Sequence, residues 1–243
     1  MERQFFESIP YIIGRTFWDR AASLALNPQR KYYEVGEIMR NEFYENQWNK
    51  NGFSNPIIIC STISAGYFKG LETMYQTAMV LRKAHFEFKW IVIGTERGDT
   101  MVRLSEKKVG EKAEHLGIDL VGVKNASQMV DLMMKADLFV QVSHIENSPN
   151  SLCEAMLLGM PIIATFAGGT ASILKDNIEG RLLQDGEPYT LAGMIMEMAQ
   201  DFEIAKQFGI NARKTALIRH NPEHVCNQLL TTYKQIIVSQ AQR

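Results

Sequence analysis

The sequence predicts an α/β domain in which helices cover both faces of a parallel sheet. From about residue 56 onward, short β-branched and continuously apolar runs alternate with helical patterns of roughly ten or more residues. A strand that is apolar along its whole length is buried on both faces, as in a parallel sheet covered by helices. Consecutive strands separated by helices form βαβ units. We therefore expect a doubly wound, Rossmann-like domain over residues 56–221.

The expected elements follow one another in a regular order. The first strand, residues 56–60, is followed by a helix at 71–82 with apolar residues at helical spacing. Ser127 is the expected N-cap of a later helix, and Ser148 is the expected N-cap of another that has Pro149 as its first residue. The remaining strands are expected at 90–94, 119–122, 138–142, 161–165 and 181–183, and the remaining helices at 100–116, 127–136, 149–158, 188–201, 203–218 and 222–238.

The two ends of the chain differ from this pattern. Residues 1–55 are rich in aromatic residues and arginine, are broken by Pro10, Pro28 and Gly36, and show no strand periodicity. We expect a helical connector that either wraps the α/β domain or packs on a partner or a further domain. Residues 222–243 are expected to form a C-terminal crossing helix with an apolar stripe that includes Leu230 and Ile237.

Composition excludes several classes of protein. Lys and Arg number 26 against 27 Asp and Glu, for a formal net charge of -1, which argues against a nucleic-acid binder held by bulk charge. No apolar run reaches the ~18 residues of a membrane span, and the N-terminus does not resemble a signal peptide. Cys60, Cys153 and Cys226 lie far apart and are interpreted as reduced thiols of a cytoplasmic protein. The five histidines show no spacing typical of a metal site, and His144 is the only one that we expect near a ligand.

Two loops after predicted strands carry residues suited to a phosphorylated ligand. In an open parallel sheet, ligands bind beyond the carboxyl ends of the strands. The loop at residues 61–70 places Lys69, a point charge suited to phosphate, after the first strand. Gly168 and Gly169 follow a later strand and permit close backbone contact with a ligand. A solvated surface lysine and a plain tight turn explain the same residues without a ligand.

The loop and helix start at residues 143–154 give the strongest chemical indication. The amides of Asn150 and Ser151 would be free at the helix N-terminus to meet an anion. Glu154 can accept both hydroxyls of a ribose diol, or it can simply stabilise the start of the helix. Because these loops follow strands of one sheet, they together predict a nucleoside diphosphate site. It has neither a Walker lysine motif nor G-x-G-x-x-G.

The block from Glu146 to Thr165, followed by Gly168-Gly169, closely resembles the E-x7-E region of GT-B glycosyltransferases, and in particular family 4, the "group 1" glycosyl transferases. Five pairs of glutamates lie eight residues apart in this chain, so the spacing alone is uninformative. Only Glu146 and Glu154 follow an apolar strand, open a helix and precede Gly-x-Pro and Gly-Gly. Lys69-Gly70, Gly122 and Ala136-Asp137 occur in the family's order, and the resemblance covers about residues 56–240.

The resemblance implies a retaining, metal-independent transferase that uses a nucleotide-diphosphate sugar of the UDP or GDP type and no cofactor. Glu154 would hold the ribose, while Glu146 on the sugar side and Lys69 on the diphosphate would be the catalytic residues. Other donor-binding residues would be Ser64, Ser148, Asn150, Ser151, Gly168 and Gly169, with Val123 and Lys124 beside the base. Two departures are Ser64, where many members carry Arg, and Ser172, where many carry Glu. One phosphate cation is then missing, or another residue such as Arg15, Lys124 or Arg97 supplies it.

A two-domain GT-B enzyme needs a further Rossmann-like domain for the acceptor. We therefore expect the donor-binding half of a longer or split enzyme, typical of bacterial polysaccharide biosynthesis. The alternative is a stand-alone nucleotide-sugar-binding or regulatory module; a sugar-nucleotide epimerase of related fold would also need two domains. Expected partners are the nucleotide sugar and an acceptor-binding domain or separate subunit. A homo-oligomer through the connector or the C-terminal helix, and a peripheral membrane contact, stay open.

Overall fold

A computed structural model describes residues 2–64 and 66–241 of the chain, so that Ala65 of the predicted Lys69 loop and residues 242 and 243 lie outside the described residues. Six parallel strands form the main sheet, in the order β5-β4-β3-β6-β7-β8. The strand order reverses between β3 and β6, which is the topological switch point of an open α/β sheet. The strands are β3 (Ile57–Thr62), β4 (Phe88–Ile93), β5 (Ile118–Leu120), β6 (Leu138–Gln141), β7 (Ile162–Thr165) and β8 (Arg181–Leu183).

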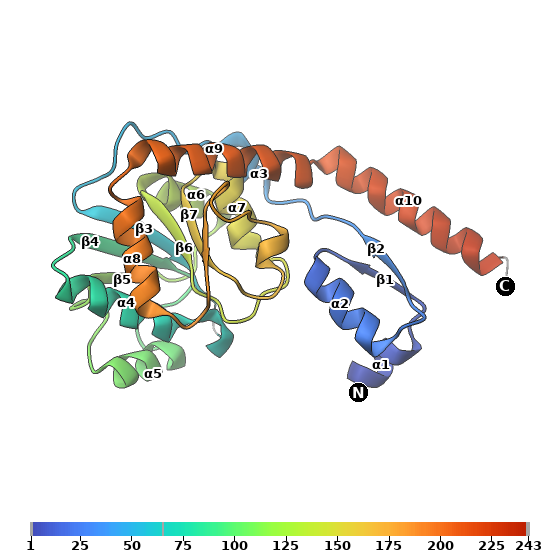
Figure 1. Ribbon diagram of the computed structural model, residues 1–243, viewed down its shortest axis with the longest axis horizontal. Coiled ribbons are helices and arrows are strands. Elements are labelled where there is room, and N and C mark those ends of the chain that lie inside the picture. The colour runs from blue at the N-terminus through green and yellow to red at the C-terminus, as the bar shows by residue number, and fades with distance from the viewer. Residues whose placement is uncertain (1, 65, 242–243) are drawn as a thin grey trace.

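Helices cover both faces of this sheet, as the doubly wound prediction requires (Figure 1). Successive residues of one strand point to opposite faces, so that Ile59 packs in one core and Cys60 in the other. The first core is completed by α4 (Leu71–Lys83), α5 (Thr100–Val109) and α8 (Pro188–Met198). The second is completed by α3 (Asn41–Glu45), α6 (Ala126–Lys135), α7 (Asn150–Leu158) and α9 (Phe202–Arg219).

Three predicted helix ends differ from the observed ones for local reasons. The helix expected to run to residue 116 ends at Val109, because Gly110 takes a left-handed conformation at its C-cap. The N-cap of α6 is Asn125, which forms a capping box with Gln128, rather than Ser127. The N-cap of α7 is Pro149 rather than Ser148, because the Ser148 hydroxyl donates to Glu37 instead of capping the helix.

The prediction that residues 1–55 contain no strand is wrong. β1 (Tyr11–Gly14) and β2 (Lys31–Glu34) pair in parallel and are joined by α2 (Phe17–Leu26), which follows α1 (Glu2–Ser8). We call residues 2–34 the N-terminal unit and residues 35–40 the linker. Strands of four residues are too short to show an alternating pattern, and this pair forms a separate sheet rather than an edge of the main one.

Polar contacts connect the N-terminal unit to the loop that follows β6. Thr16 Oγ1 donates to Asn147 Oδ1 at 2.6 Å, and Asn147 Nδ2 donates to Asp19 Oδ2 at 2.9 Å. The Phe17 amide donates to Ser172 Oγ at 3.2 Å. The hydroxyl of Ser172 therefore contacts the N-terminal unit.

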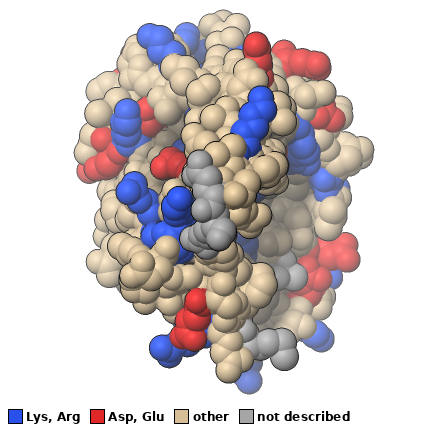
Figure 2. Space-filling model, turned by 90° about the vertical axis from the view of Figure 1, so that its right-hand side faces the viewer, with Lys and Arg blue, Asp and Glu red and all other residues tan. Residues whose placement is uncertain are grey.

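The last helix, α10 (Pro222–Ala241), extends beyond the six-stranded domain past the N-terminal unit (Figure 1). Leu230, Tyr233 and Ile237 are exposed on it, so the predicted apolar stripe is open to solvent in this chain. Figure 2 shows basic and acidic side chains interspersed over this side of the molecule, in keeping with a formal net charge of -1. Among the described residues, no helix combines the length and apolar character needed to cross a membrane.

Candidate donor-binding site

A cavity of about 670 Å³ opens at the carboxyl ends of β3, β4 and β6, where the strand order reverses. Such a position is where open α/β sheets bind ligands. Every predicted site residue except Gly168 and Gly169 lines it, namely Ser64, Lys69, Val123, Lys124, Glu146, Ser148, Asn150, Ser151 and Glu154. The structure thus brings the Lys69 loop and the loop and helix start at residues 143–154 to one cavity, together with residues 123 and 124, but it does not bring the Gly168-Gly169 loop there.

Glu146 marks one end of this cavity. Lys69 Nζ lies 2.6 Å from Glu146 Oε1, which also accepts the hydroxyl of Ser143 at 2.8 Å. Lys69 ends a short 3-10 helix, η1 (Tyr67–Lys69), and the following Gly70 has φ +70°. A Cβ on Gly70 would lie 1.9 Å from the carbonyl oxygen of Val142. Glycine therefore allows the lysine loop to lie against the loop after β6, which sets the lysine on the carboxylate.

Glu154 marks the other end of the cavity. It is 3% exposed, and its two oxygens accept from Arg40, at 2.7 Å from Nε to Oε1 and 2.8 Å from Nη2 to Oε2. Burial raises the pKa of the Glu154 carboxyl, and the hydrogen bonds and charge of Arg40 offset part of that rise. Arg40 also lies over the ring of Phe43, 4.9 Å from its centroid. The sequence reasoning missed Arg40.

The first turn of α7 lies between these two carboxylates. The amides of Asn150 and Ser151 belong to this turn, where helical geometry provides no intrahelical acceptor. The positive end of the helix dipole points the same way, which makes the turn suited to an anion. The Ser148 hydroxyl, in contrast, donates to Glu37 Oε1 at 2.5 Å.

Gly168 and Gly169 do not line the cavity, contrary to the expectation that their amides meet the ligand. The Gly169 amide donates to the Glu146 carbonyl oxygen at 2.9 Å. A Cβ on Gly168 would lie 2.0 Å from that same oxygen, and one on Gly169 would lie 2.0 Å from the carbonyl oxygen of Asn147. The two glycines therefore allow the loop after β7 to lie against the loop after β6. This contact supports the backbone of Glu146.

Additional cations reach the cavity from outside the three predicted loops. Arg15, in the loop after β1, lines it and places Nε 3.3 Å from Glu37 Oε2. Lys124 also lines the cavity and donates to the Val121 carbonyl. Arg97, the third suggested cation, instead pairs with Glu114 at 2.7 Å on the surface. With Arg40 and Lys69, four basic and two acidic side chains line the cavity in the described part of the chain.

His144 was the histidine expected near a ligand, and it points elsewhere. Its Nε2 lies 2.7 Å from Glu72 Oε1 and its Nδ1 lies 3.1 Å from Asp185 Oδ2. Its amide donates to the Phe68 carbonyl at 2.8 Å. The imidazole thus joins the loop after β6 to the first turn of α4 and to the loop after β8, whereas the backbone amide contacts the lysine loop, and the side chain does not line the cavity.

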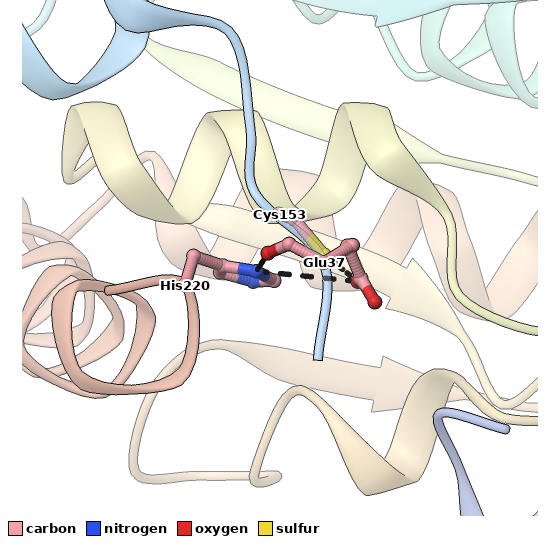
Figure 3. A group of neighbouring side chains, drawn as sticks. All are labelled: Glu37, Cys153 and His220. Carbon is pink, nitrogen blue, oxygen red and sulfur yellow. Dashed lines mark hydrogen bonds and ion pairs between the residues drawn. The ribbon is translucent and has the colours of Figure 1, made fainter. Parts of the chain in front are cut away.

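Glu37, Cys153 and His220 form a buried cluster (Figure 3), which the cavity-lining Ser148 contacts through Glu37. Its ligand-type atoms lie within 4.8 Å of one another, a spacing that would also suit a metal ion. His220 Nδ1 lies 2.8 Å from the Glu37 carbonyl, which only accepts hydrogen bonds, so this nitrogen carries the proton. Burial raises the pKa of the Cys153 thiol and lowers that of His220. The cluster therefore joins the linker, α7 and the end of α9 through hydrogen bonds between uncharged donors and Glu37.

Comparison with known proteins assigns the chain to a family. The sequence model of the family described as "Glycosyl transferases group 1" matches residues 43–215, which is most of the chain. The chain belongs to this family, and the resemblance seen in the sequence is confirmed. It is 24% identical over 157 residues to the amylovoran biosynthesis glycosyltransferase AmsK of Erwinia amylovora, a match that covers 62% of this chain and 38% of AmsK. The chain thus spans less than half the length of that relative.

Solved structures of glycosyltransferases share the fold. Anabaena Alr3699/HepE, in complex with UDP and glucose, superposes with a TM-score of 0.72 at 17% identity, covering 93% of this chain and 63% of that one. The pneumococcal O-GlcNAc transferase GtfA, in complex with UDP and GlcNAc, gives a TM-score of 0.75 at 15% identity, covering 96% of this chain and 47% of GtfA. The predicted Rossmann-like half of a GT-B fold is thereby confirmed.

Proposed function

We propose that this chain is the donor-binding half of a retaining, metal-independent glycosyltransferase. It would bind a nucleotide-diphosphate sugar of the UDP or GDP type, and the sugar would pass to a glycan or lipid-linked glycan. The observation that carries this proposal is the cavity at the switch point, where two carboxylates, each held by a cation, flank the N-terminus of α7. The UDP and sugar bound in the HepE and GtfA structures support the choice of ligand.

Each part of the cavity has a role in this proposal. Glu154 would accept the ribose hydroxyls, and Val123 and Lys124 would flank the base. Lys69 and the first-turn amides of α7 would compensate the diphosphate charge, which grows on the leaving group as the sugar departs. Because this compensation comes from the chain itself, no metal ion would be needed. Glu146 would face the transferred sugar.

The acceptor would be bound outside the residues described. A further domain or a separate subunit would supply that site and would contact the exposed apolar side chains of α10, such as Tyr233 and Ile237. A homo-oligomer or a peripheral membrane contact through the same surface would be an alternative use of it. The name of AmsK, an amylovoran biosynthesis enzyme, favours a role in bacterial polysaccharide biosynthesis, which we place in the cytoplasm.

Calorimetric titration with UDP, GDP and ADP tests this proposal. The experiment is run first with EDTA and then with magnesium ions, on protein whose cooperative unfolding has been verified. We expect one diphosphate to bind in preference to the other two, with the same affinity in both buffers. Failure of the folded chain to bind any of them would contradict the proposal, and binding that requires magnesium would contradict its metal independence.

A stand-alone nucleotide-sugar-binding or regulatory module is the second candidate. The residues proposed for the base, the ribose and the diphosphate all line one cavity, which is what binding without transfer requires. The two candidates differ in chemistry rather than in binding. The experiment adds cell-derived glycan acceptors and the acceptor-binding subunit to the chain with bound UDP-sugar. Release of UDP supports the transferase, whereas binding of the UDP-sugar without release supports the module.

A further inference from the structure

Arg40 donates hydrogen bonds to Glu154, the carboxylate that the proposed function assigns to the ribose. Its guanidinium approaches Glu154 as a two-pronged fork, with one nitrogen on each carboxylate oxygen, at 2.7 and 2.8 Å. This bidentate arrangement is the strongest form of the arginine–carboxylate contact. The Glu154 side chain is 4% exposed, whereas that of Arg40 is 42% exposed. The accessible side of the buried carboxylate is therefore covered by arginine.

A ribose diol and this fork compete for the same two oxygens. Each oxygen of Glu154 keeps a second lone pair, but the side chain is only 4% exposed and Arg40 covers its accessible side, so a diol reaches both oxygens only when the guanidinium moves aside. Removing the arginine without replacement would leave a buried carboxylate unpaired, which is costly. The arginine therefore stabilises the empty cavity, and a nucleoside has to displace it in order to bind.

When a nucleoside diphosphate is bound, its diphosphate would be a second anion within the same cavity for the displaced guanidinium. Arg40 is the N-cap residue of α3, in extended conformation at the end of the linker, so it lies outside the regular helix. It lines the cavity together with Lys69, the residue proposed to contact the diphosphate. A guanidinium matches the geometry of phosphate oxygens as well as that of a carboxylate.

We propose that Arg40 is a positioning residue that exchanges partners when the donor binds. In the empty cavity it holds Glu154; when a nucleoside diphosphate enters, the ribose hydroxyls take Glu154 and the guanidinium turns to the diphosphate. The proposal rests on the donor-binding function proposed above. It gives Arg40 opposite effects on two ligands, because the arginine opposes the binding of a nucleoside and favours the binding of a nucleoside diphosphate.

The test compares Arg40→Gln with the unmodified chain for uridine and UDP, and in parallel for guanosine and GDP. We expect Arg40→Gln to weaken the preferred diphosphate about tenfold or more, the effect of losing a charge-assisted hydrogen bond. The matching nucleoside should bind at least as tightly as it does to the unmodified chain. Arg97→Gln, which removes an arginine paired with Glu114 outside the cavity, serves as the control and should change neither affinity.

Equal weakening of nucleoside and diphosphate by Arg40→Gln would overturn the exchange and leave Arg40 a purely structural role. Arg40→Lys provides the second variant if Arg40→Gln fails to fold. It keeps the charge but lacks the fork, so it should retain part of the diphosphate affinity while binding the nucleoside more tightly; an unchanged ratio of the two affinities would overturn the proposal. If the unmodified chain binds neither UDP nor GDP, the donor-binding function itself fails, which is a separate result.

Discussion

The two ends of the cavity are built from the same kind of pair and differ in where the cation comes from. At one end Lys69 meets Glu146, and both belong to loops of the six-stranded domain. At the other end Arg40 meets Glu154 across 114 residues of sequence, reaching from the linker to α7. The Glu154 side chain is 4% exposed and that of Glu146 is 11% exposed. The more buried carboxylate is the one held by the linker.

The two carboxylates of the cavity are therefore positioned by different parts of the chain. The lysine end depends on the loops after β3 and β6, and the loop after β7 supports the backbone of Glu146. The arginine end depends on how the linker lies across α7, and the linker is held by Glu37 through Ser148, Cys153 and His220. Changes at the Glu146 end should therefore act within the loops after β3, β6 and β7, whereas changes at the Glu154 end should report on how the linker lies across α7.

Replacing Glu154 by alanine should have the largest effect on nucleotide affinity. Loss of charge-assisted hydrogen bonds to a diol costs about 1.5–3 kcal/mol, so the dissociation constant for UDP or GDP should rise roughly ten- to a hundredfold. Calorimetry measures this change. Glu114→Ala, at another glutamate of the same eight-residue spacing but outside the cavity, is the matched control. An unchanged dissociation constant in folded Glu154→Ala would exclude the ribose assignment.

Replacing Lys69 by alanine should weaken the diphosphate by about tenfold while affecting the nucleoside much less. The reason is that a lysine contact to phosphate contributes about as much as one charge-assisted hydrogen bond, and a nucleoside lacks the phosphates. The ratio of UDP to uridine affinities measures the difference. Lys89→Ala, at a surface lysine paired with Asp119, is the control. Equal losses for both ligands would reject a phosphate role for Lys69.

The smallest expected effect is on the pH dependence of stability. Burial raises the pKa of Glu154 in the folded protein above its ordinary value, so the ionised form is disfavoured there. Its contribution to stability is complete below the ordinary glutamate pKa and is lost as pH rises through the raised value. Glu154→Gln removes this titration. The melting temperature of Glu154→Gln minus that of the unmodified chain should therefore increase as pH rises from the ordinary glutamate pKa through the raised pKa of Glu154. A difference that stays flat or falls would contradict the raised pKa.

The sequence was sufficient for the main sheet and for the two carboxylates. Ile57–Thr62 and the strands after it show continuous apolar runs, and Glu146 and Glu154 were distinguished by the strand and helix around them. Arg40 was not predictable, because its partner is distant in sequence and no strand or glycine turn marks it. The strands of the N-terminal unit are four residues each, too short for a periodic signal.

Loop contacts were the other limit of the sequence reasoning. A Gly-Gly pair fits close approach to a ligand and close approach to another loop equally well. The structure favours the second, because the carbonyl oxygens of Glu146 and Asn147 lie where Cβ atoms of Gly168 and Gly169 would be. His144 was expected near the ligand from its position in the chain, but the carboxylates that hold it, Glu72 and Asp185, lie far away in sequence.

The most direct test of the account is whether Glu154 recognises the ribose diol. The measurement is the affinity of the unmodified chain and of Glu154→Gln for UDP and 2′-deoxy-UDP, with GDP and 2′-deoxy-GDP in parallel. The account predicts that the unmodified chain prefers the ribonucleotide about tenfold and that Glu154→Gln loses most of this preference. The same preference in both proteins would contradict the central claim that this carboxylate binds the donor ribose.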